Sequence, residues 1–355
     1  MLKKYTFNFL YLILVFALLE IGSRVFFSEF NENNIFYDKN EFHRVSKGKD
    51  TFFQYINETQ FRVSKLNEKI LFNDKKSIWF LGDSITNGYG VNFEDTYYSI
   101  FKKEFNKDVN VYASSKYGYN FKNTFSNLNK TIIKHIKEND IVIYQFNFND
   151  ILEIAKKSSN IKDDDIPGKR KFISFINDTN IFRYKYLNHS TFFKVLQHYA
   201  SIAVRKTNGD CLNRKIDALG PYTYAYFAKG YEDKSLELWK IFIKDLKIMS
   251  KKLELMNVNF FVLIPPISLD VYNHDKINKL KYDLKCSTKN GAEYIKKIFY
   301  ENEIDFIDTL PSFNYFSKKT SNKDKLLFHS YDTNHPNELG HKLIALEILK
   351  KLNTF

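Results

Sequence analysis

Residues 77–90 of this 355-residue chain read SIWFLGDSITNGYG, an apolar run followed by a turn with glycine on either side. A short continuous apolar run is typical of a buried parallel strand, which predicts a strand at residues 77–81. The glycines permit a tight reversal of the chain at the carboxyl end of that strand. Ser84 is therefore expected on a sharp strand-to-helix turn, at the edge where open α/β sheets bind ligands. The same residue types also form ordinary turns, so this stretch alone leaves both readings open.

A second motif lies near the carboxyl end, where residues 331–345 read YDTNHPNELGHKLIA. Asp332 precedes His335 by three residues, so both side chains can project from one loop ahead of a helix that Pro336 is expected to open. Ser84, Asp332 and His335 would then supply the hydroxyl, the carboxylate and the imidazole of a hydrolytic triad. The structural alternative is that Asp332 caps the helix and His335 is a surface histidine.

These two segments resemble the first and last sequence blocks of the SGNH (GDSL) hydrolase family. Segments matching the two remaining blocks lie between them, in order. Residues 109–120 read as a strand and a loop in which Gly118 matches the family glycine, and residues 140–150 read as a strand and a loop in which Asn149 matches the family asparagine. The resemblance implies ester chemistry through an acyl-enzyme on Ser84. It also implies an oxyanion hole built from the backbone N–H groups of Ser84 and Gly118 and the side-chain amide of Asn149.

Two stretches depart from the family pattern. Asn147 stands where the family often has glycine, and residues 113–115 are poorer in glycine than the family. Asparagine tolerates left-handed conformations better than most residues, so Asn147 is compatible with a turn. The structural alternatives are that Gly118 only serves a turn and that Asn149 only ends a strand. Structural roles are expected for Asp83, Asp150 and His341.

The amino terminus places two lysines before an apolar stretch at residues 5–27. These 23 residues are long enough for a helix to cross about 30 Å of hydrocarbon, which predicts an uncleaved transmembrane anchor at residues 1–27. The lysines indicate a cytoplasmic amino end and a catalytic domain outside the cytoplasm, in the periplasm or beyond the cell. A cleaved signal peptide and a buried helix are the alternatives. Glu20 and Arg24 lie four residues apart and are expected to pair.

The composition argues against several partners. Lysine and arginine number 54 against 41 acidic residues, which gives a net charge of +13. Only seven of the 54 are arginine and no long basic tract occurs, so no nucleic-acid partner is expected. The eight histidines are scattered and the cysteines have no metal-ligand spacing, so no metal or other cofactor is expected. Cys211 and Cys286 are compatible with one disulfide in an oxidising compartment.

Apolar strands alternate with helical patterns along most of the chain, which predicts a mostly parallel sheet with helices on both faces. The family resemblance implies the same three-layer α/β/α, flavodoxin-like fold with a five-stranded sheet. The hydrolase domain is expected at residues 71–355, behind a lead-in segment at 28–70. An aromatic-rich insertion at about 151–231 is expected either to select the substrate or to pack a small core of its own. The strands are predicted near residues 77–81, 109–114, 140–146, 259–266 and 305–308.

The sequence therefore predicts a membrane-anchored serine esterase. Its substrate would be a carboxylic ester of a small molecule or a glycan, such as an O-acetyl group on a glycan. An O-acyltransferase with the same triad is the alternative in chemistry, because a sugar hydroxyl would then replace water in the second step. A catalytically silent glycan-binding or assembly protein is the alternative from another class, and the complete triad argues against it. These residues specify neither the acyl group, nor the alcohol, nor any protein partner.

Overall fold

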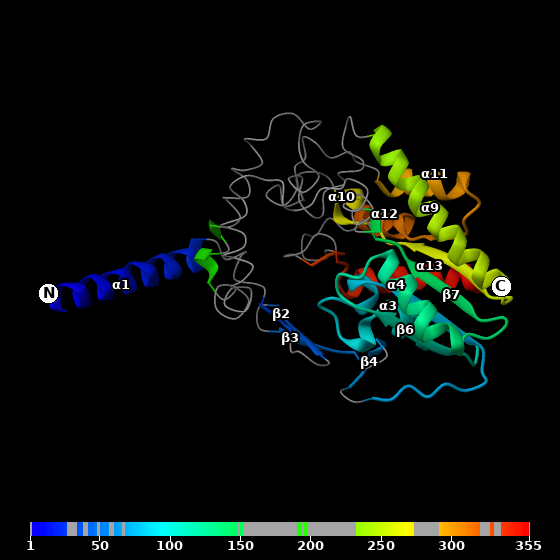
Figure 1. Ribbon diagram of the computed structural model, residues 1–355, viewed down its shortest axis with the longest axis horizontal. Helices are drawn as coiled ribbons and strands as arrows, with labels where there is room; N and C mark the ends of the chain where they lie inside the picture. The colour runs from blue at the N-terminus through cyan, green and yellow to red at the C-terminus, as the bar shows by residue number, and fades with distance from the viewer. Residues whose placement is uncertain are drawn as a thin grey trace.

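In a computed structural model, the described residues of the chain form two sheets and their flanking helices (Figure 1). One sheet has five parallel strands and the other has four antiparallel strands. The residues that the structure describes are 2–26, 34–37, 42–47, 50–56, 60–65, 68–147, 150–151, 190–193, 195–196, 232–272, 291–319, 327–329 and 335–354.

The five-stranded sheet has the strand order β6-β5-β7-β8-β9, and every pairing in it is parallel. If these five strands are numbered 1 to 5 in chain order, from β5 to β9, the order in the sheet is 2-1-3-4-5. This is the flavodoxin-like arrangement that the family resemblance implies. The direction of winding reverses between β5 and β7, so the carboxyl ends of these two strands flank the crevice in which such sheets bind ligands. The strands are β5 (Ser77–Gly82), β6 (Asn110–Ser115), β7 (Ile141–Gln145), β8 (Asn259–Ile264) and β9 (Phe306–Asp308).

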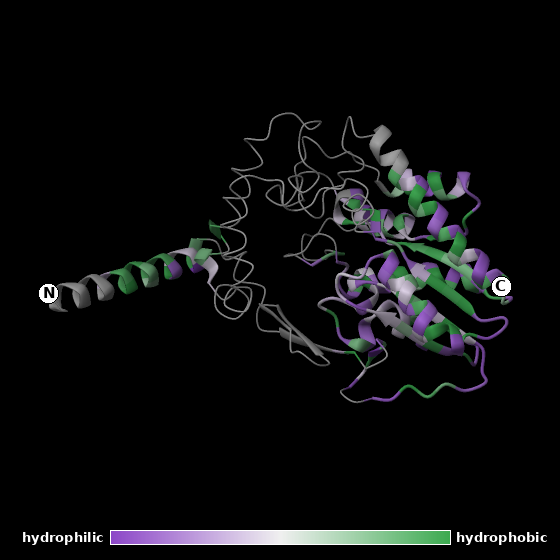
Figure 2. Ribbon diagram, in the orientation of Figure 1, coloured by the Kyte–Doolittle hydropathy of each residue, from purple (hydrophilic) through white to green (hydrophobic). Residues whose placement is uncertain are grey.

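Continuous apolar sequence places β5 and β7 at the centre of the sheet. Every residue of these two strands is buried, which is the pattern of strands covered on both faces. Figure 2 shows the central strands as the hydrophobic part of the sheet, while polar residues lie on the outward sides of the helices.

Ring contacts assign the helices to two layers. In one layer the rings of Tyr97 and His341 stack with centroids 5.7 Å apart, which joins α3 to α13. In the other layer Phe242 lies 5.3 Å from Phe121 and 6.5 Å from Phe299, which joins α9 to α4 and α11. The helices are α2 (Ser84–Asn87), α3 (Tyr97–Glu104), α4 (Phe121–Asn127), α9 (Glu232–Glu254), α10 (Ser268–Val271), α11 (Gly291–Glu301), α12 (Leu310–Lys319) and α13 (Glu338–Leu352). The short helices α10 and α12 were not predicted from the sequence.

The segment predicted only as a lead-in forms the antiparallel sheet β1-β2-β3-β4. Its last part attaches to the edge strand of the parallel sheet, because Phe61 forms a bridge with Ser114 and the N–H of Ser115 donates to the carbonyl of Gln60 at 3.2 Å. The amino-terminal sheet thus ends beside the carboxyl end of β6. Its strands are β1 (Asn34–Tyr37), β2 (Phe42–Lys47), β3 (Asp50–Ile56) and β4 (Arg62–Val63).

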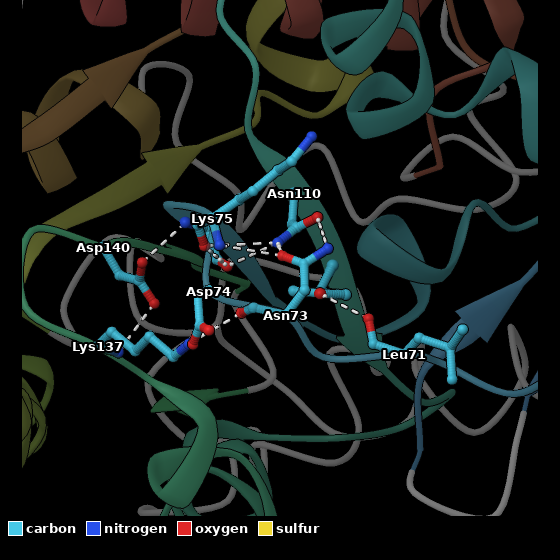
Figure 3. A network of polar contacts seen from close by, with 9 residues as sticks. Leu71, Asn73, Asp74, Lys75, Asn110, Lys137 and Asp140 are labelled. Carbon is cyan, nitrogen blue, oxygen red and sulfur yellow. Dashed lines mark hydrogen bonds and ion pairs between the residues drawn. The ribbon is translucent and has the colours of Figure 1, made fainter.

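A polar network holds the opposite, amino-terminal edge of the parallel sheet (Figure 3). The buried carboxylate of Asp140 accepts hydrogen bonds from the N–H of Ser77 at 2.7 Å, the indole of Trp79 at 2.9 Å and the N–H of Lys137 at 3.0 Å. Because these bonds satisfy a carboxylate that is out of contact with water, they fix the starts of β5 and β7 relative to each other.

The amino-terminal stretch is helical, as predicted, and forms α1 (Leu2–Phe26). Among the helices in the described ranges, none has the combination of length and apolarity needed to cross a membrane. The transmembrane anchor predicted at residues 1–27 is therefore not supported.

The predicted pairing of Glu20 with Arg24 is confirmed at 2.8 Å. Glu20 also accepts hydrogen bonds from the hydroxyl of Ser190 and the N–H groups of Thr191 and Phe192. The carboxylate of α1 thus binds a segment that lies 170 residues further along the chain.

The start of the last helix differs from the prediction. Pro336 was expected at its first position, but α13 begins at Glu338 and Asn337 is its N-cap. The amide oxygen of Asn337 accepts the N–H of Gly340 at 3.1 Å, and this bond satisfies a first-turn donor that proline cannot serve. Pro336 instead forms an isolated antiparallel bridge with Phe328.

Candidate active site

Ser84 lies on a sharp turn between β5 and α2, as predicted. The turn requires glycine at position 82. A Cβ atom there would clash with the side chain of Gln145, because it would lie 2.6 Å from the Oε1 atom. Gly88 closes α2 with a φ of +78°, a conformation that favours glycine, and its N–H donates to the carbonyl of Ile85 at 3.1 Å. The hydroxyl is thereby presented at the carboxyl edge of the sheet, beside the point where the winding reverses.

The structure brings Ser84 and His335 together from opposite ends of the domain. The Oγ atom of Ser84 and the Nε2 atom of His335 lie 2.7 Å apart, within hydrogen-bond distance. The two residues are only 9% and 8% exposed, so the pair lies mostly shielded from water. A hydroxyl and an imidazole nitrogen at this distance have the geometry of a nucleophile and its general base.

Contacts of the backbone and of the ring hold His335. Pro336 pairs with Phe328, and the carbonyl of His335 accepts the N–H of His329 at 3.2 Å. The ring of Tyr89 packs on the imidazole with centroids 4.4 Å apart, and the Tyr89 carbonyl is 2.9 Å from Nε2 of His329. Tyr89 therefore supports the base, a role that sequence reasoning missed.

The backbone N–H of Ser84 is available to a ligand. Within the described part of the chain it has no hydrogen-bond acceptor, and it opens the helix that follows. An N–H group in this position can stabilise the oxygen anion that develops in acyl transfer, as predicted for Ser84. Its neighbours in the turn all donate to protein acceptors, namely the N–H groups of Asp83, Ile85, Thr86 and Asn87.

Gln145, at the end of β7, organises the turn that carries Ser84. Its buried Oε1 atom accepts three hydrogen bonds, from the N–H of Asp83 at 3.2 Å, the N–H of Thr86 at 3.2 Å and the hydroxyl of Thr86 at 3.0 Å. Its Nε2 atom donates to the carbonyl of Phe146 at 2.9 Å, which fixes the orientation of the amide. The available signal in the sequence is one glutamine in an otherwise apolar strand.

Replacing Gln145 with methionine is expected to disturb this turn. Gln145→Met leaves two buried N–H groups without their acceptor, at a cost of about 1–3 kcal/mol in the free energy of unfolding. We expect fluorophosphonate labelling of Ser84 to slow as well, because the turn loses the contacts that hold it. Chemical denaturation and labelling kinetics on the full chain measure both effects. A lower stability with an unchanged labelling rate would restrict Gln145 to a structural role.

Two buried carboxyl groups lie beneath the turn, joined by Asn147. The side-chain amide of Asn147 donates to Asp83, and its N–H donates to Asp150 at 2.9 Å. Burial raises the pKa of Asp150 to about 8, although the hydroxyl of Tyr144 donates to it at 2.5 Å, and burial also raises the pKa of Asp83. Both carboxyls thus serve internal hydrogen bonds. Glycine at position 147 would lack the amide that binds Asp83, which gives the departure from the family pattern a structural reason.

Gly118 lies in the turn that follows β6. Its φ is +69°, and the N–H of Tyr119 donates to the carbonyl of Lys116 at 3.1 Å across this turn. A Cβ atom at Gly118 would meet nothing within 4 Å, so its backbone conformation and not lack of space favours glycine. The adjacent Tyr117 ring packs 5.5 Å from that of Tyr89, which places this loop beside the residues around His335.

Asn149 and Asp332 lie outside the described residues, and their roles remain predictions. The same holds for Cys211, Cys286 and most of the insertion at 151–231. On either side of Phe148 and Asn149, which both lie outside the described residues, the N–H of Asp150 donates to the carbonyl of Asn147 at 3.0 Å.

His341 has the structural role expected from the sequence. Burial lowers its pKa to about 3, so the imidazole is neutral near pH 7. Its Nδ1 atom accepts the N–H of Tyr97 at 3.2 Å. His341 thereby satisfies a free N–H in the first turn of α3, because the side chain of the N-cap residue Thr96 accepts no hydrogen bond from that turn.

No protein-family model matches the chain, and no curated protein matches it. Solved structures do. The chain is similar to a lipolytic protein of the G-D-S-L family from Veillonella parvula, with 14% identity over 79% of this chain and 100% of that chain at a TM-score of 0.38.

Two further solved structures to which the chain is similar are an esterase and a lipase. A variant of the acetyl xylan esterase Axe2 from Geobacillus stearothermophilus is 13% identical over 78% of this chain and 94% of that chain, at a TM-score of 0.39. A lipase/acylhydrolase from Enterococcus faecalis is 10% identical over 79% of this chain and 96% of that chain, at a TM-score of 0.38. The chemistry of the candidate site is inferred from its own geometry.

Proposed function

We propose that this chain is a serine esterase that cleaves a carboxylic ester through an acyl-enzyme on Ser84. The contact of 2.7 Å between Ser84 Oγ and His335 Nε2 carries the proposal. A buried serine hydroxyl held against an imidazole, beside a backbone N–H without an acceptor, combines the nucleophile, the base and one oxyanion donor that acyl transfer requires.

The reaction proceeds in two steps. His335 Nε2 takes the proton of Ser84 as Oγ attacks the ester carbonyl, and the same proton then passes to the departing alcohol. Water, activated by the imidazole, releases the acid from Ser84 in the second step. Asp332 is proposed to hold the imidazole in the tautomer protonated at Nδ1. The N–H groups of Ser84 and Gly118 and the amide of Asn149 are proposed to bind the oxyanion.

Asn149→Ala tests the third oxyanion donor. We expect kcat to fall about a hundredfold or more, because loss of one preorganised donor removes stabilisation of the transition state. KM and the unfolding temperature should change little. Steady-state kinetics with an aryl acetate measure the effect, and an unchanged kcat would remove Asn149 from the site.

A fluorophosphonate tests the proposed function directly, because it forms a covalent adduct only with an activated serine. Intact-mass analysis of the full chain should show one adduct for each molecule. The full chain is required because a fragment beginning within β3 (Asp50–Ile56) would break the amino-terminal sheet. Absence of labelling in folded protein would contradict the proposal and favour the silent glycan-binding or assembly protein.

The products distinguish hydrolysis from acyl transfer. For an esterase we expect free carboxylic acid in an amount equal to the alcohol released, even when sugar hydroxyls are present. A transferase would release the alcohol with less free acid and yield an acylated sugar. We propose a small acyl group, such as acetyl on a glycan, on the basis of the family resemblance.

A location outside the cytoplasm remains a proposal, based on the lysines that precede the apolar stretch of α1. Protease treatment of intact cells and of permeabilised cells tests it. Digestion of the hydrolase domain only after the cytoplasmic membrane is opened would contradict it.

A further inference from the structure

Arg62 places a cation in the interior, behind the turn that carries Ser84. It belongs to β4 of the amino-terminal sheet and is only 3% exposed. Its Nε atom donates to the carbonyl of Asn87 at 3.1 Å. Its Nη1 atom donates to the carbonyls of Val63 at 2.8 Å and Tyr55 at 3.4 Å. One guanidinium thus joins the amino-terminal sheet to the last residue of α2.

This arrangement has two costs in stability, beside one favourable contact of the guanidinium with the Phe93 ring, whose centroid lies 5.6 Å from Cζ. Within the described residues, every hydrogen bond of the guanidinium goes to a carbonyl oxygen, and Nη2 has no acceptor. A buried charge without a carboxylate and a buried donor without an acceptor both cost free energy. An apolar side chain of similar length would avoid both costs, as replacements of buried charges often do. Local rules are broken in this way mainly at functional sites.

The contact with Asn87 bears directly on the nucleophile. Helix α2 is only four residues long, with Ser84 at its first position and Asn87 at its last. Gln145 fixes the first turn through the N–H groups of Asp83 and Thr86, whereas Arg62 binds a carbonyl at the other end. A cation is also favourable at this end, where helix carbonyls point outward. Movement of so short a helix would shift Ser84 relative to His335.

We infer that Arg62 is a positioning residue, through which the amino-terminal sheet holds Ser84 within hydrogen-bond distance of His335. The inference rests on the proposed esterase function. Arg62 does not touch the reacting atoms. It acts through the backbone of Asn87, and the amino-terminal sheet therefore contributes to the geometry of the active site.

Two variants of the full chain test this inference. Arg62→Met keeps most of the side-chain volume and removes the charge and the three hydrogen bonds. We expect the rate constant of fluorophosphonate labelling to fall about tenfold, because small displacements of a nucleophile have large effects on rate. The unfolding temperature should change by only a few degrees, because removal of the buried charge offsets the loss of a donor to these carbonyls. Arg62→Lys retains a charge and one carbonyl contact, and we expect a rate between those of Arg62→Met and the wild type.

Leu253→Ala is the matched control, since Leu253 is fully buried in α9 and belongs to a layer away from the turn. It should lower the unfolding temperature without changing the labelling rate. A wild-type labelling rate in folded Arg62→Met overturns the inference, as does a loss no larger than that of an equally destabilised Leu253→Ala. If Arg62→Met does not fold, an unchanged rate in Arg62→Lys overturns it. Absence of labelling in the wild type would instead contradict the esterase proposal itself.

Discussion

Ser84→Ala is expected to abolish the fluorophosphonate adduct and to lower ester hydrolysis by a factor on the order of 10⁶. The substitution removes the Oγ atom that lies 2.7 Å from His335 and leaves the imidazole without a nucleophile to activate. The fold should be retained, because Ser84 Oγ makes no other hydrogen bond within the described residues and one hydroxyl contributes little packing. Intact-mass analysis and the rate of alcohol release from an aryl ester measure the two effects.

Ser77→Ala supplies the matched control. Ser77 is the first residue of β5, whereas Ser84 follows the carboxyl end of that strand. The hydroxyl of Ser77 donates to the carbonyl of Lys75 at 3.1 Å. We expect Ser77→Ala to label like the wild type. Retention of the adduct in Ser84→Ala, with a modified peptide elsewhere, would show that another residue is the nucleophile.

The local part of this site is predictable from the sequence. The apolar run of β5 predicts a buried strand, and the glycines after it predict the turn at Ser84. Both features depend on residues that are close together in the sequence. His335 could be paired with Ser84 because the chemistry of the triad restricts the choice of base. The parallel sheet with helices on both faces follows in the same way from the alternation of strands and helices, whereas the strand order does not.

The supporting residues could not be predicted, because their roles arise from contacts across the fold. Gln145 contacts Thr86 across 59 positions, and Arg62 contacts Asn87 across 25 positions. No spacing in the sequence marks such pairs, and a glutamine in a strand or an arginine before a loop has many ordinary roles. The helix start at Glu338 was missed for a local reason. The side chain of Asn337 caps the helix, and this contribution outweighs the preference of proline for the first helical position.

Three separate elements hold the short helix that bears the nucleophile. Gln145 binds its first turn from the central strand β7, Arg62 binds its end from the amino-terminal sheet, and Asn87 donates to the carbonyl of Ser115 at 3.5 Å in β6. Catalysis by preorganised groups requires such rigidity, because the donors must already point at the developing charge. The proposed site therefore gives the buried polar groups in this region a role beyond their contribution to stability.

His335→Gln is expected to reduce hydrolysis nearly as far as removal of the nucleophile, by a factor of about 10⁴ to 10⁶. Glutamine has a similar length and retains a hydrogen-bonding group near Ser84 Oγ, but it cannot take up the proton. The packing of Tyr89 against residue 335 should largely remain, so the unfolding temperature should fall by only a few degrees. Single-turnover labelling over a range of pH measures the loss of the base.

The pH profile separates loss of a base from loss of packing. In the wild type, acidification protonates the imidazole and should slow labelling, because only the neutral ring accepts the proton of Ser84. The small residual rate of His335→Gln should not share this decrease. His135→Ala is the matched control, since His135 stacks on Phe72 with centroids 3.8 Å apart, away from Ser84, and its loss should leave the wild-type profile intact. A His335→Gln variant with the wild-type rate and profile would show that the contact at 2.7 Å is structural, and Ser84 would then need a different base.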